Sequence, residues 1–406
     1  MSDALKEAPE TDYTVIGAGI IGLTVAHALL EKRPSASVSI FEKEPDIGYH
    51  ASGRNSGVVH SGIYYKPGTH KAVLCVEGAR RLKEFALRHE IPYRQAGKLI
   101  LAASEEERGA LEVLCANAAG NGVTAHSLTS REILAREPFA QSTFGGLHVP
   151  ETGVIDSPRV LATLKELLTQ KGVRFYFGEK VEQVVHEGRR REIRTTRFRH
   201  PFSFAFNCAG AYADAVAKMF GVGLDYVLIP FKGIYYELSP EQDSLVKESL
   251  YPVPDLRFPF LGVHLTRNVH GKVYVGPTAI PALGRENYRG LEGFAWSELG
   301  ETISEMIGLY RSSEGFRRLA MNELRKYSKS IFHEMARRLV PSLRKEDLIP
   351  SRKVGIRPQL ANSKTKMLEL DFLFEKTPSS YHVLNSISPA FTSSFAVAEK
   401  IVREVS

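Results

Sequence analysis

The chain has 406 residues, of which 43% are apolar and 24% are charged, with a formal net charge of +7. This length and apolar content suit a globular protein with two domains and exclude an extended disordered chain. A charge of +7 over this length is too mild to favour nucleic-acid binding, which requires clustered basic residues. The cysteines Cys75, Cys115 and Cys208 have neither CxxC nor Cys/His spacing, so we expect no disulfide framework and no metal site. A reducing compartment fits this cysteine usage best.

The first residues, MSDALKEAPETDY, contain no apolar run and resemble neither a secretory signal nor a transit peptide. No stretch approaches the roughly 20 apolar residues that a membrane-spanning helix needs. We therefore expect a cytoplasmic protein whose contact with the inner membrane is at most peripheral.

The first predicted elements are a strand, a glycine turn and a helix. A β-branched run, Tyr13 to Ile16, leads into GAGIIG, and an apolar helix follows to Arg33. Gly17, Gly19 and Gly22 have the GxGxxG spacing, which allows a tight turn, close approach of a pyrophosphate to the backbone, and close packing of helix on strand.

A second strand, Ser37 to Phe41, ends at Glu42, twenty residues past Gly22. A carboxylate at this position accepts hydrogen bonds from both ribose hydroxyls of a dinucleotide. The alternative is a plain surface acid. We expect a dinucleotide site that includes the three glycines together with Ile20, Glu42 and Lys43.

The next segment, SGRNSGVVHSGIYY, is rich in glycine and polar residues and is typical of a loop around an isoalloxazine. No second glycine fingerprint follows between residues 100 and 350, so a substrate rather than NAD(P)H is expected to reduce the flavin. The cofactor-binding candidates in this loop are Ser52, Arg54, Asn55 and Ser56, whereas His60, Tyr64 and Tyr65 are expected on the substrate side.

Further along the chain, Gln95 to Ser104 is predicted to be a strand, residues 104–123 an amphipathic helix with acids in its first turn, and Phe144 to Val149 another strand. The pattern predicts two strands over residues 172–188, with Val181 near an adenine.

Residues 202–220 are predicted to form a strand, a small-residue turn and a helix. Ala209 and Gly210 in this turn are cofactor-binding candidates, the alternative being a packing turn. Residues 226–276 have a strand-like pattern and residues 296–345 a mostly helical one.

Several motifs occur in an order that resembles one family. They are DYTVIGAGIIGL, SGRNSGVVHSGIYYKPGTHKAVLCVEG, RFPFLGVHLTR, VGIRPQL and HVLNSISPAFTSSFAVAEKI. Together they resemble the L-2-hydroxyglutarate dehydrogenase/oxidase family of the D-amino-acid-oxidase-like flavoproteins, over nearly the whole chain. The resemblance implies an FAD cofactor, oxidation of a 2-hydroxy diacid to its 2-oxo acid, and transfer of electrons to a quinone or to oxygen.

The fold expected from these features is α/β: a Rossmann-type FAD-binding domain of the glutathione-reductase-like kind, with an inserted α+β, mixed-sheet substrate domain. We expect the FAD-binding domain to comprise residues 1–90, 150–225 and 350–406. The substrate-binding domain is expected to comprise residues 91–149 and 226–349.

Oxidation of a 2-hydroxy acid requires a group that binds the carboxylate. Arg357 in GIRPQL is the first candidate, because guanidinium binds a carboxylate bidentately and Pro358 stiffens the strand end. The alternative is a surface salt bridge. A five-carbon diacid has a second carboxylate, for which the sequence does not rank the candidates Arg54, Lys66, Lys232 and Arg267.

The reaction also requires a base for the hydroxyl proton, and a neutral imidazole is suited to that role at pH 7. His264 lies in an apolar strand, FLGVHLT, and His60 in the flavin-wrapping loop, where flavin contact is the alternative role. A strand histidine such as His264 is otherwise a hydrogen-bonded core residue.

The C-terminal segment SISPAFTSSFAVAEKIV begins with small polar residues and continues as an apolar helix. The positive end of such a helix stabilises an anionic reduced flavin, so Ser388, Ala390 and Thr392 are cofactor-binding candidates. An ordinary N-capping cluster is the alternative.

Two basic segments remain. Residues 187–200 are predicted to form an exposed hairpin with a solvated basic face. The basic helical region 311–346 either packs on the core with a solvated side or rests on an anionic bilayer and delivers electrons to a quinone.

The sequence is also compatible with two other functions. An amino-acid or amine oxidase binds its substrate through a similar carboxylate anchor and transfers a hydride to the flavin from a carbon that bears nitrogen. A protein that binds FAD without catalysis is the other alternative, and the concentration of polar groups in the 52–65 loop disfavours it.

Overall fold

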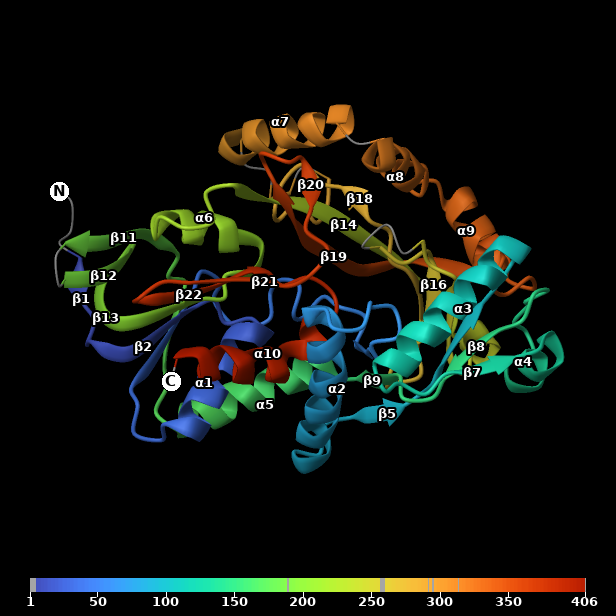
Figure 1. The fold of residues 1–406 in the computed structure, drawn as a ribbon, viewed down its shortest axis with the longest axis horizontal. Coiled ribbons are helices and arrows are strands. Elements are labelled where there is room, and N and C mark those ends of the chain that lie inside the picture. Colours follow the sequence, from blue (N-terminus) through green and yellow to red (C-terminus); the bar gives the residue numbers. More distant parts are fainter. Residues whose placement is uncertain are drawn as a thin grey trace. The chain divides into compact units, whose positions relative to one another are not determined.

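The computed structural model describes residues 5–187, 190–255, 260–290, 292–293, 296–312 and 314–405. The chain folds into two compact units (Figure 1). Unit 1 comprises Met1–Arg54, Ser157–Leu228 and Pro358–Ser406, and unit 2 comprises Asn55–Asp156 and Ile229–Arg357. The chain therefore passes from unit 1 to unit 2 and back twice.

Nine of the described strands in unit 1 form one sheet, whose centre is parallel in the order β10-β3-β2-β13-β22. Beyond this centre, β12 and β11 continue the sheet from β13 as antiparallel neighbours, and β21 pairs with β22. The strands are β1 (Lys6–Glu7), β2 (Thr11–Ile16), β3 (Val38–Glu42), β10 (Arg174–Phe177), β11 (Val181–Glu187), β12 (Arg190–Thr195), β13 (Phe198–Asn207), β21 (Leu373–Lys376) and β22 (Ser380–Asn385).

Three helices of unit 1 pack together: α1 (Ile20–Lys32) contacts both α5 (Ser157–Gln170) and α10 (Ala390–Val405), as Figure 1 shows. A fourth helix, α6 (Ala213–Met219), packs on β22. Helix α1 is buried along most of its length because β2, α1 and β3 form a βαβ unit with α1 between the sheet and its neighbouring helices. The α/β fold with a Rossmann-type parallel sheet is therefore as the sequence predicts.

Unit 2 contains a large mixed sheet with the strand order β19-β14-β17-β16-β15-β6-β8-β7 and β18 beside β14. Its strands are β6 (Lys98–Leu101), β7 (His126–Leu128), β8 (Gly146–Val149), β14 (Tyr226–Leu238), β15 (Ser249–Pro252), β16 (His264–Arg267), β17 (Val273–Gly276), β18 (Ile280–Pro281) and β19 (Leu348–Asn362). The first residues of β14 and the last of β19 belong to unit 1, where β20 (Met367–Leu368) pairs with β19.

Residues 55–90, 150–156 and 350–357 pack within unit 2, whereas the sequence pattern predicts them in the FAD-binding domain. They include β4 (Val58–Val59), which pairs with β9 (Gly153–Ile155), and β9 also pairs with β5 (Tyr93–Gln95) in a three-stranded sheet. Helix α2 (His70–Arg88) contacts β5. The pairing between β4 and β9 is nonlocal, so no local sequence signal indicates it.

The remaining helices of unit 2 are α3 (Glu105–Gly120), α4 (Ser130–Arg136), α7 (Trp296–Ser312), α8 (Glu314–Arg325) and α9 (Lys329–Arg337). Helix α3 begins after Ser104, whose hydroxyl accepts a hydrogen bond from the Glu107 backbone N–H. Its first turn is rich in acids, which agrees with the helix start predicted from the sequence. The strand predicted over Gln95 to Ser104 is wrong in part: it is interrupted at Gly97, which has φ +74°, and only β6 continues in the large sheet.

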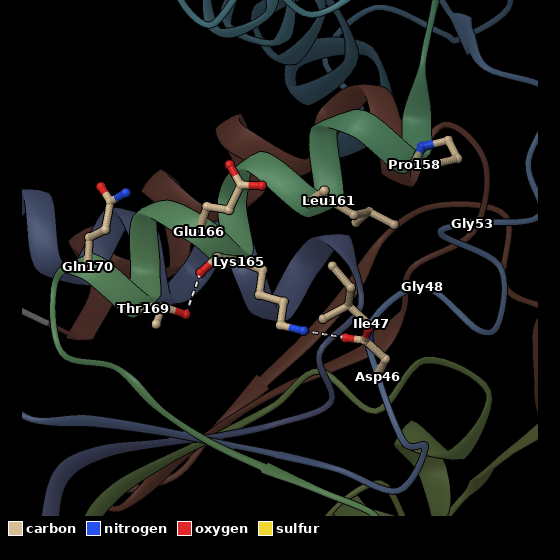
Figure 2. A pocket seen from close by; sticks show the side chains of 11 residues that line it. Asp46, Ile47, Gly48, Gly53, Pro158, Leu161, Lys165, Glu166, Thr169 and Gln170 are labelled. Atoms are coloured by element: carbon tan, nitrogen blue, oxygen red, sulfur yellow. Dashed lines mark hydrogen bonds and ion pairs between the residues drawn. The ribbon is translucent and has the colours of Figure 1, made fainter.

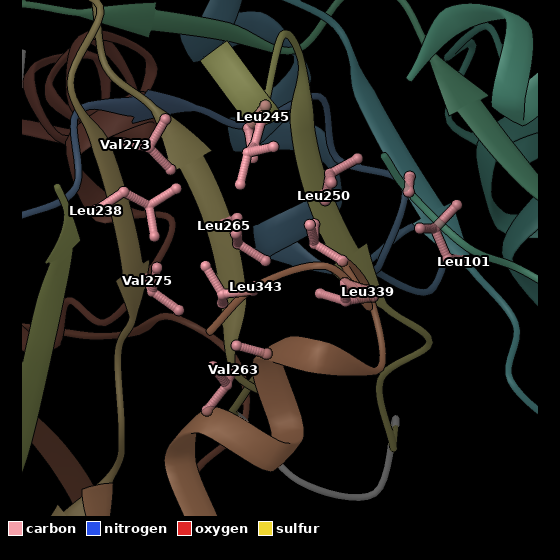
Figure 3. Packing of buried hydrophobic residues seen from close by; sticks show 14 of the residues in the cluster. Leu101, Leu238, Leu245, Leu250, Val263, Leu265, Val273, Val275, Leu339 and Leu343 are labelled. Carbon is pink, nitrogen blue, oxygen red and sulfur yellow. The ribbon is translucent and has the colours of Figure 1, made fainter. Parts of the chain in front are cut away.

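One face of the large sheet is apolar. Figure 3 shows leucine and valine side chains from β6, β14, β15, β16 and β17 packed together with Leu339 and Leu343, which follow α9. Phe332 and Ala336 of α9 also belong to this cluster. Side chains of alternate strand residues point to opposite faces, so the residues between these apolar ones lie on the other face.

That other face carries polar and aromatic side chains, and we call it the polar face. Most of its side chains are buried, at 6% exposure or less. Helix α3 contacts β8, and its apolar residues belong to the same cluster as Ile100 and Tyr251 of this face. The polar face includes Lys98, Tyr235, Ser249, Tyr251, His264, Thr266 and Tyr274.

None of the helices within the described ranges is both long enough and apolar enough to cross a membrane.

Candidate functional site

The glycine turn of unit 1 has the backbone that a dinucleotide requires. Gly17 has φ +104°, and a side chain there would place its Cβ 2.5 Å from the carbonyl oxygen of Cys208. A Cβ on Gly22 would collide with the carbonyl oxygen of Gly17, so α1 packs on the turn only because this residue is glycine. Gly19 is the N-cap of α1 and offers no side-chain cap of its own. The turn therefore leaves backbone and the positive end of α1 available to an anion.

Two polar side chains hold this turn. The Glu42 carboxylate accepts hydrogen bonds from Ala18 N at 2.8 Å and from Glu44 N at 3.0 Å. The Ser52 hydroxyl accepts one from the backbone N–H of Ile20 at 2.9 Å. Because each carboxylate oxygen has a further lone pair, Glu42 keeps the capacity to accept from ribose hydroxyls. Lys43 instead forms an ion pair with Glu44.

The turn after β13 lies at the end of the same parallel sheet. The backbone N–H of Ala209 donates to Asn207 Oδ1 at 3.2 Å, and Gly210 has φ +57°. A Cβ built on Gly210 meets no described atom within 4 Å, so the turn needs glycine for its conformation and leaves space beside it. Val181, the adenine candidate, begins β11 and is 5% exposed.

The C-terminal helix differs from expectation at one residue. Ala390, the first residue of α10, does not offer a free N–H, because its backbone donates to the carbonyl of Ile387 at 2.8 Å. The small polar residues before the helix form a tight turn that satisfies this donor internally. Ser388 is half-buried and Thr392 is 1% exposed.

The polar loop after Ser52 continues from one unit into the other. Arg54 is the last residue of unit 1, and its Nε donates to the carbonyl of Tyr49 at 2.6 Å. Asn55 begins unit 2, and its side chain accepts from the Gly57 N–H at 2.8 Å. Ser56 hydrogen-bonds the phenol of Tyr235.

His264 lies on the polar face of unit 2 and is 5% exposed. Its Nδ1 is 2.8 Å from the carbonyl oxygen of Gly262, which only accepts hydrogen bonds, so Nδ1 carries the proton and Nε2 has the lone pair. Burial, with the nearby charges of Lys98 and Arg357, lowers the pKa of His264 to about 3. The ring is therefore neutral at pH 7 and is able to accept a proton at Nε2.

His60 and two tyrosines of the 52–65 loop lie in the same electrostatic environment. Burial lowers the pKa of His60 to about 3, with Lys98, His264 and Arg357 adding to the effect. Burial also raises the pKa values of Tyr64 and Tyr65 well above 10. These groups are close enough to influence one another, so the structure brings the loop residues and the polar face together within unit 2.

Arg357, the last residue of unit 2, belongs to the same cluster. Its guanidinium lies over the ring of Phe260, with Cζ 5.2 Å from the ring centroid. Burial lowers the pKa of Arg357, and Tyr235, Tyr65 and Glu323 oppose that shift. The residues Arg257, Phe258 and Pro259 of the RFPFLGVHLTR motif lie outside the described residues.

The other predicted anchors for a second carboxylate are engaged elsewhere or exposed. Lys66 is exposed. Lys232 donates to Asn287 Oδ1 at 2.9 Å, and Arg267 donates to the backbone carbonyls of Gly271 and Val246.

Sequence reasoning missed Lys98, which is 1% exposed at the start of β6. Its Nζ lies 4.2 Å from the ring centroid of Tyr64 and 5.2 Å from that of Tyr251. Within the described part of the chain, this Nζ has no hydrogen-bond partner. Burial lowers the pKa of Lys98 to about 7. The available signal was a lysine at the head of an otherwise apolar strand, KLIL.

A separate depression of about 660 Å³ lies in unit 1 between α5 and the loop after β3, and the Lys165–Asp46 ion pair crosses it (Figure 2). It contains none of the predicted site residues. Its lining is Asp46, Ile47, Gly48, Gly53, Pro158, Leu161, Ala162, Lys165, Glu166, Thr169 and Gln170.

The two units thus contain different sets of functional groups. Unit 1 has a glycine turn, a helix N-terminus and a carboxylate, which suit a dinucleotide. The cluster of unit 2 combines a permanent cation, Arg357, with a lysine whose pKa of about 7 leaves it partly charged at neutral pH, two neutral imidazoles and several phenols. This set suits a small anion that loses a proton.

Comparison with known proteins gives a consistent result. Residues 12–404 match the family model described as FAD dependent oxidoreductase. The chain is 36% identical over 386 residues to L-2-hydroxyglutarate dehydrogenase of Indibacter alkaliphilus, covering 94% of this chain and 96% of that protein. It is 34% identical over 422 residues to the mitochondrial L-2-hydroxyglutarate dehydrogenase of Homo sapiens, covering 97% of this chain and 88% of that protein.

Solved structures share the fold at lower sequence identity. An FAD-bound L-alpha-glycerophosphate oxidase from Mycoplasma pneumoniae aligns with a TM-score of 0.80 at 21% identity, covering 98% of this chain and 95% of that chain. A glycine oxidase from Geobacillus kaustophilus aligns with a TM-score of 0.73 at 18% identity, covering 98% of this chain and 96% of that chain.

Proposed function

The chain belongs to the FAD-dependent oxidoreductase family and, within it, to the L-2-hydroxyglutarate dehydrogenases, and from this we propose that it oxidises L-2-hydroxyglutarate to 2-oxoglutarate. The observation that supports this most directly is the cluster of unit 2, in which half-buried Arg357 lies close enough to a neutral, oriented His264 to lower the pKa of that imidazole. A 2-hydroxy acid needs both a cation for its carboxylate and a base for its hydroxyl.

Unit 1 is the FAD-binding part in this proposal. Its residues fit the cofactor because Gly17 and Gly22 leave no room for a side chain and Gly210 leaves space beside the turn. Glu42 would accept from the ribose, and the N-terminus of α1 would face the pyrophosphate. FAD, when bound, supplies a two-electron acceptor for the hydrogen on the hydroxyl-bearing carbon.

Unit 2 is the substrate-binding part. Arg357 would bind the carboxylate next to the hydroxyl, and its stacking on Phe260 limits the positions of the guanidinium. Tyr64 and Tyr65 stay protonated because burial raises their pKa values, so their phenols remain donors to a bound acid.

His264 would accept the hydroxyl proton at Nε2. The pKa of about 3 belongs to the protein without substrate, and a bound carboxylate nearby raises the pKa of an imidazole. The substrate itself therefore makes His264 a better base. His60 would contact the cofactor or the substrate from the 52–65 loop.

Anaerobic titration of the FAD-loaded protein tests the proposal. L-2-hydroxyglutarate is expected to bleach the flavin absorbance and to yield one equivalent of 2-oxoglutarate. Bleaching by amino acids alone would establish the amino-acid oxidase alternative, and bleaching by neither would leave only FAD binding.

The electrons then pass to a quinone or to oxygen. Peroxide yield and quinone reduction, measured side by side on the purified protein, distinguish the two acceptors. Near-stoichiometric peroxide would identify an oxidase, and peroxide-free quinone reduction would identify a dehydrogenase.

Peripheral membrane contact has a candidate surface on α7 and α8, which we call the exposed stripe. Ile303, Ile307 and Tyr310 recur at helical spacing on α7 and are 37%, 45% and 42% exposed. Met321 and Leu324 of α8 are 53% and 46% exposed. Exposed basic residues accompany them at Arg311, Arg318 and Arg325. Apolar side chains among cations suit the surface of an anionic bilayer.

Sedimentation with vesicles tests this contact. The protein is expected to bind vesicles that contain phosphatidylglycerol more than neutral ones, and the Ile307→Asp/Leu324→Asp double variant is expected to lose this binding. Val113→Asp on α3, where the valine is 50% exposed, is the matched control. Equal binding by all three proteins would exclude the exposed stripe as the contact.

A further inference from the structure

A buried lysine in unit 2 has no role in the proposed chemistry so far. Lys98 is 1% exposed, and its Nζ has no hydrogen-bond partner among the described residues. A buried ammonium group without a compensating anion is costly, and burial accordingly lowers the pKa of Lys98 to about 7, so the amine is only partly charged at neutral pH. A buried, partly charged amine without a partner needs an explanation.

The surroundings of Lys98 do not supply an anion. Its nearest aromatic neighbours are the rings of Tyr64 and Tyr251, and burial keeps both phenols protonated. Cys75 also influences Lys98, but burial raises the pKa of that thiol to about 12, so it is neutral at pH 7.

Two further buried donors lie beside Lys98. Ser249 is directly opposite Lys98 in the β15–β6 register, and its Oγ has no partner within the described ranges. The phenol oxygen of Tyr64 is likewise buried without a partner in the part of the chain that the structure describes. An ammonium, a hydroxyl and a phenol together provide the donors that a carboxylate accepts.

We infer that Lys98, with Ser249 and Tyr64, binds the second carboxylate of a dicarboxylic 2-hydroxy acid and so selects diacids over monoacids. The inference rests on the proposed function, because it assumes that Arg357 binds the carboxylate next to the hydroxyl. It replaces the earlier candidates, since Lys66 is exposed and the other three already donate to protein oxygens, namely Arg54, Lys232 and Arg267.

The electrostatics agree with this assignment. Lys98 lies close enough to His60 and His264 to lower the pKa values of both imidazoles. A dianion pairs with Arg357 and also raises the pKa of Lys98, which holds the amine in its charged form, whereas a monoacid leaves the buried amine of Lys98 without an anion.

The test compares two substrates of equal length. L-2-hydroxyglutarate and L-2-hydroxypentanoate differ only in that a methyl group replaces the second carboxylate. In Lys98→Met, the ratio of kcat/KM for the diacid to that for the monoacid is expected to fall about 10- to 100-fold, because one charge-assisted contact is lost. The kcat/KM for the monoacid is expected to stay within about threefold of the wild-type value.

A binding measurement accompanies the kinetics. Dissociation constants for glutarate and pentanoate are obtained from the change in flavin absorbance of the FAD-loaded protein. The wild type is expected to prefer glutarate, and Lys98→Met to lose that preference. Lys98→Gln serves as the second variant if Lys98→Met yields little folded protein, and the same loss is expected for it.

Lys272→Met is the matched control. Lys272 belongs to the same unit, but it donates to the Leu238 carbonyl at 2.9 Å and lies 3.8 Å from the Asp243 carboxylate. Its replacement is expected to leave both ratios unchanged.

An unchanged diacid preference in Lys98→Met would overturn the inference. An equal loss of activity towards both substrates would overturn it too, since it would place Lys98 at the reacting end. If the wild type fails to oxidise L-2-hydroxyglutarate but still prefers glutarate through Lys98, the proposed function fails and the diacid site stands.

Discussion

The imidazole of His264 stacks on the phenol ring of Tyr251, with ring centroids 4.0 Å apart and planes 15° apart. The Gly262 carbonyl holds Nδ1 of the same imidazole at 2.8 Å. These two contacts fix both the plane of the ring and its tautomer, which leaves Nε2 as the one basic nitrogen. An orientation set in this way is what a proton acceptor needs and is more than a space-filling core residue requires.

Replacement of His264 by glutamine is expected to lower kcat by roughly 10²- to 10⁴-fold, because the proton loses its acceptor while the carboxylate contacts remain. KM is expected to change little. Stopped-flow measurement of flavin reduction by L-2-hydroxyglutarate reports this step directly.

The control is His148→Gln. His148 lies on β8 and is also buried, at 7% exposure, but it is engaged with Glu248 at 3.2 Å. Its replacement is expected to leave kcat within about twofold of the wild-type value. A normal rate of flavin reduction in His264→Gln would transfer the role to His60 or to solvent.

Replacement of Arg357 by alanine is expected to raise KM and lower kcat while FAD stays bound. The lost carboxylate contact is worth about 2 to 4 kcal/mol, which corresponds to a fall of about 30- to 700-fold in kcat/KM. Arg357→Lys keeps the charge but loses the planar fork, so an intermediate fall is expected. Arg80→Ala, which removes an exposed arginine paired with Glu77 and Glu84 on α2, is the control. Normal kinetics in Arg357→Ala would remove Arg357 from the site.

Two glycine-to-alanine changes test whether glycine is required at the glycine turn but not at an ordinary helix position. At Gly22 an added Cβ collides with the Gly17 carbonyl, so Gly22→Ala is expected to displace α1 and to lose FAD. At Gly109, in α3, a Cβ meets nothing within 4 Å of the described residues, so Gly109→Ala is expected to stabilise the protein by about 0.5–1 kcal/mol. Flavin content per chain and thermal unfolding measure both effects. Full flavin content in Gly22→Ala would contradict the packing argument.

The elements of unit 1 were predictable because their signals are local. The spacing of Gly17, Gly19 and Gly22, the following apolar helix and Glu42 all lie within one βαβ unit, and each reflects a short-range steric or electrostatic need. The basic segment 187–200 also forms a hairpin, with β12 and β13 antiparallel, although Gly188 and Arg189 lie outside the described residues. It is less exposed than predicted, since Ile193 and His200 are fully buried.

Lys98 could not be predicted in the same way. A lysine is ordinarily expected in water, and only the long-range pairing of β6 with β15 and β8, together with the cover of α3, buries it. His264 was accessible to sequence reasoning because it interrupts an apolar strand, but the partners that orient it come from β15 and from the turn before β16. Tertiary contacts therefore determine the burial of Lys98 and the orientation of His264, which local sequence patterns do not predict.

Buried histidines in unit 1 predict how stability depends on pH. His200 is fully buried against the hydroxyls of Thr11 and Thr14, at 3.0 and 2.9 Å, and burial lowers its pKa to about 4. An unfolded histidine has a pKa of about 6.5, so between pH 6.5 and 4 the unfolded chain binds a proton that the folded chain does not. This contribution to stability is therefore fully present above pH 6.5 and is lost as the pH falls to 4.

Replacement of His200 by glutamine isolates that contribution. The carboxamide is able to hydrogen-bond both threonines but does not titrate, so the variant is expected to lose less stability than the wild type between pH 7 and pH 5. The difference is expected to be about 1–2 kcal/mol, since one titrating group contributes at most about 1.4 kcal/mol per pH unit. Urea unfolding at the two pH values measures it, with His126→Gln, at an exposed histidine of β7, as the control that should keep the wild-type slope. Equal slopes in wild type and His200→Gln would mean that His200 is protonated in the folded protein, against the burial that its threonine contacts describe.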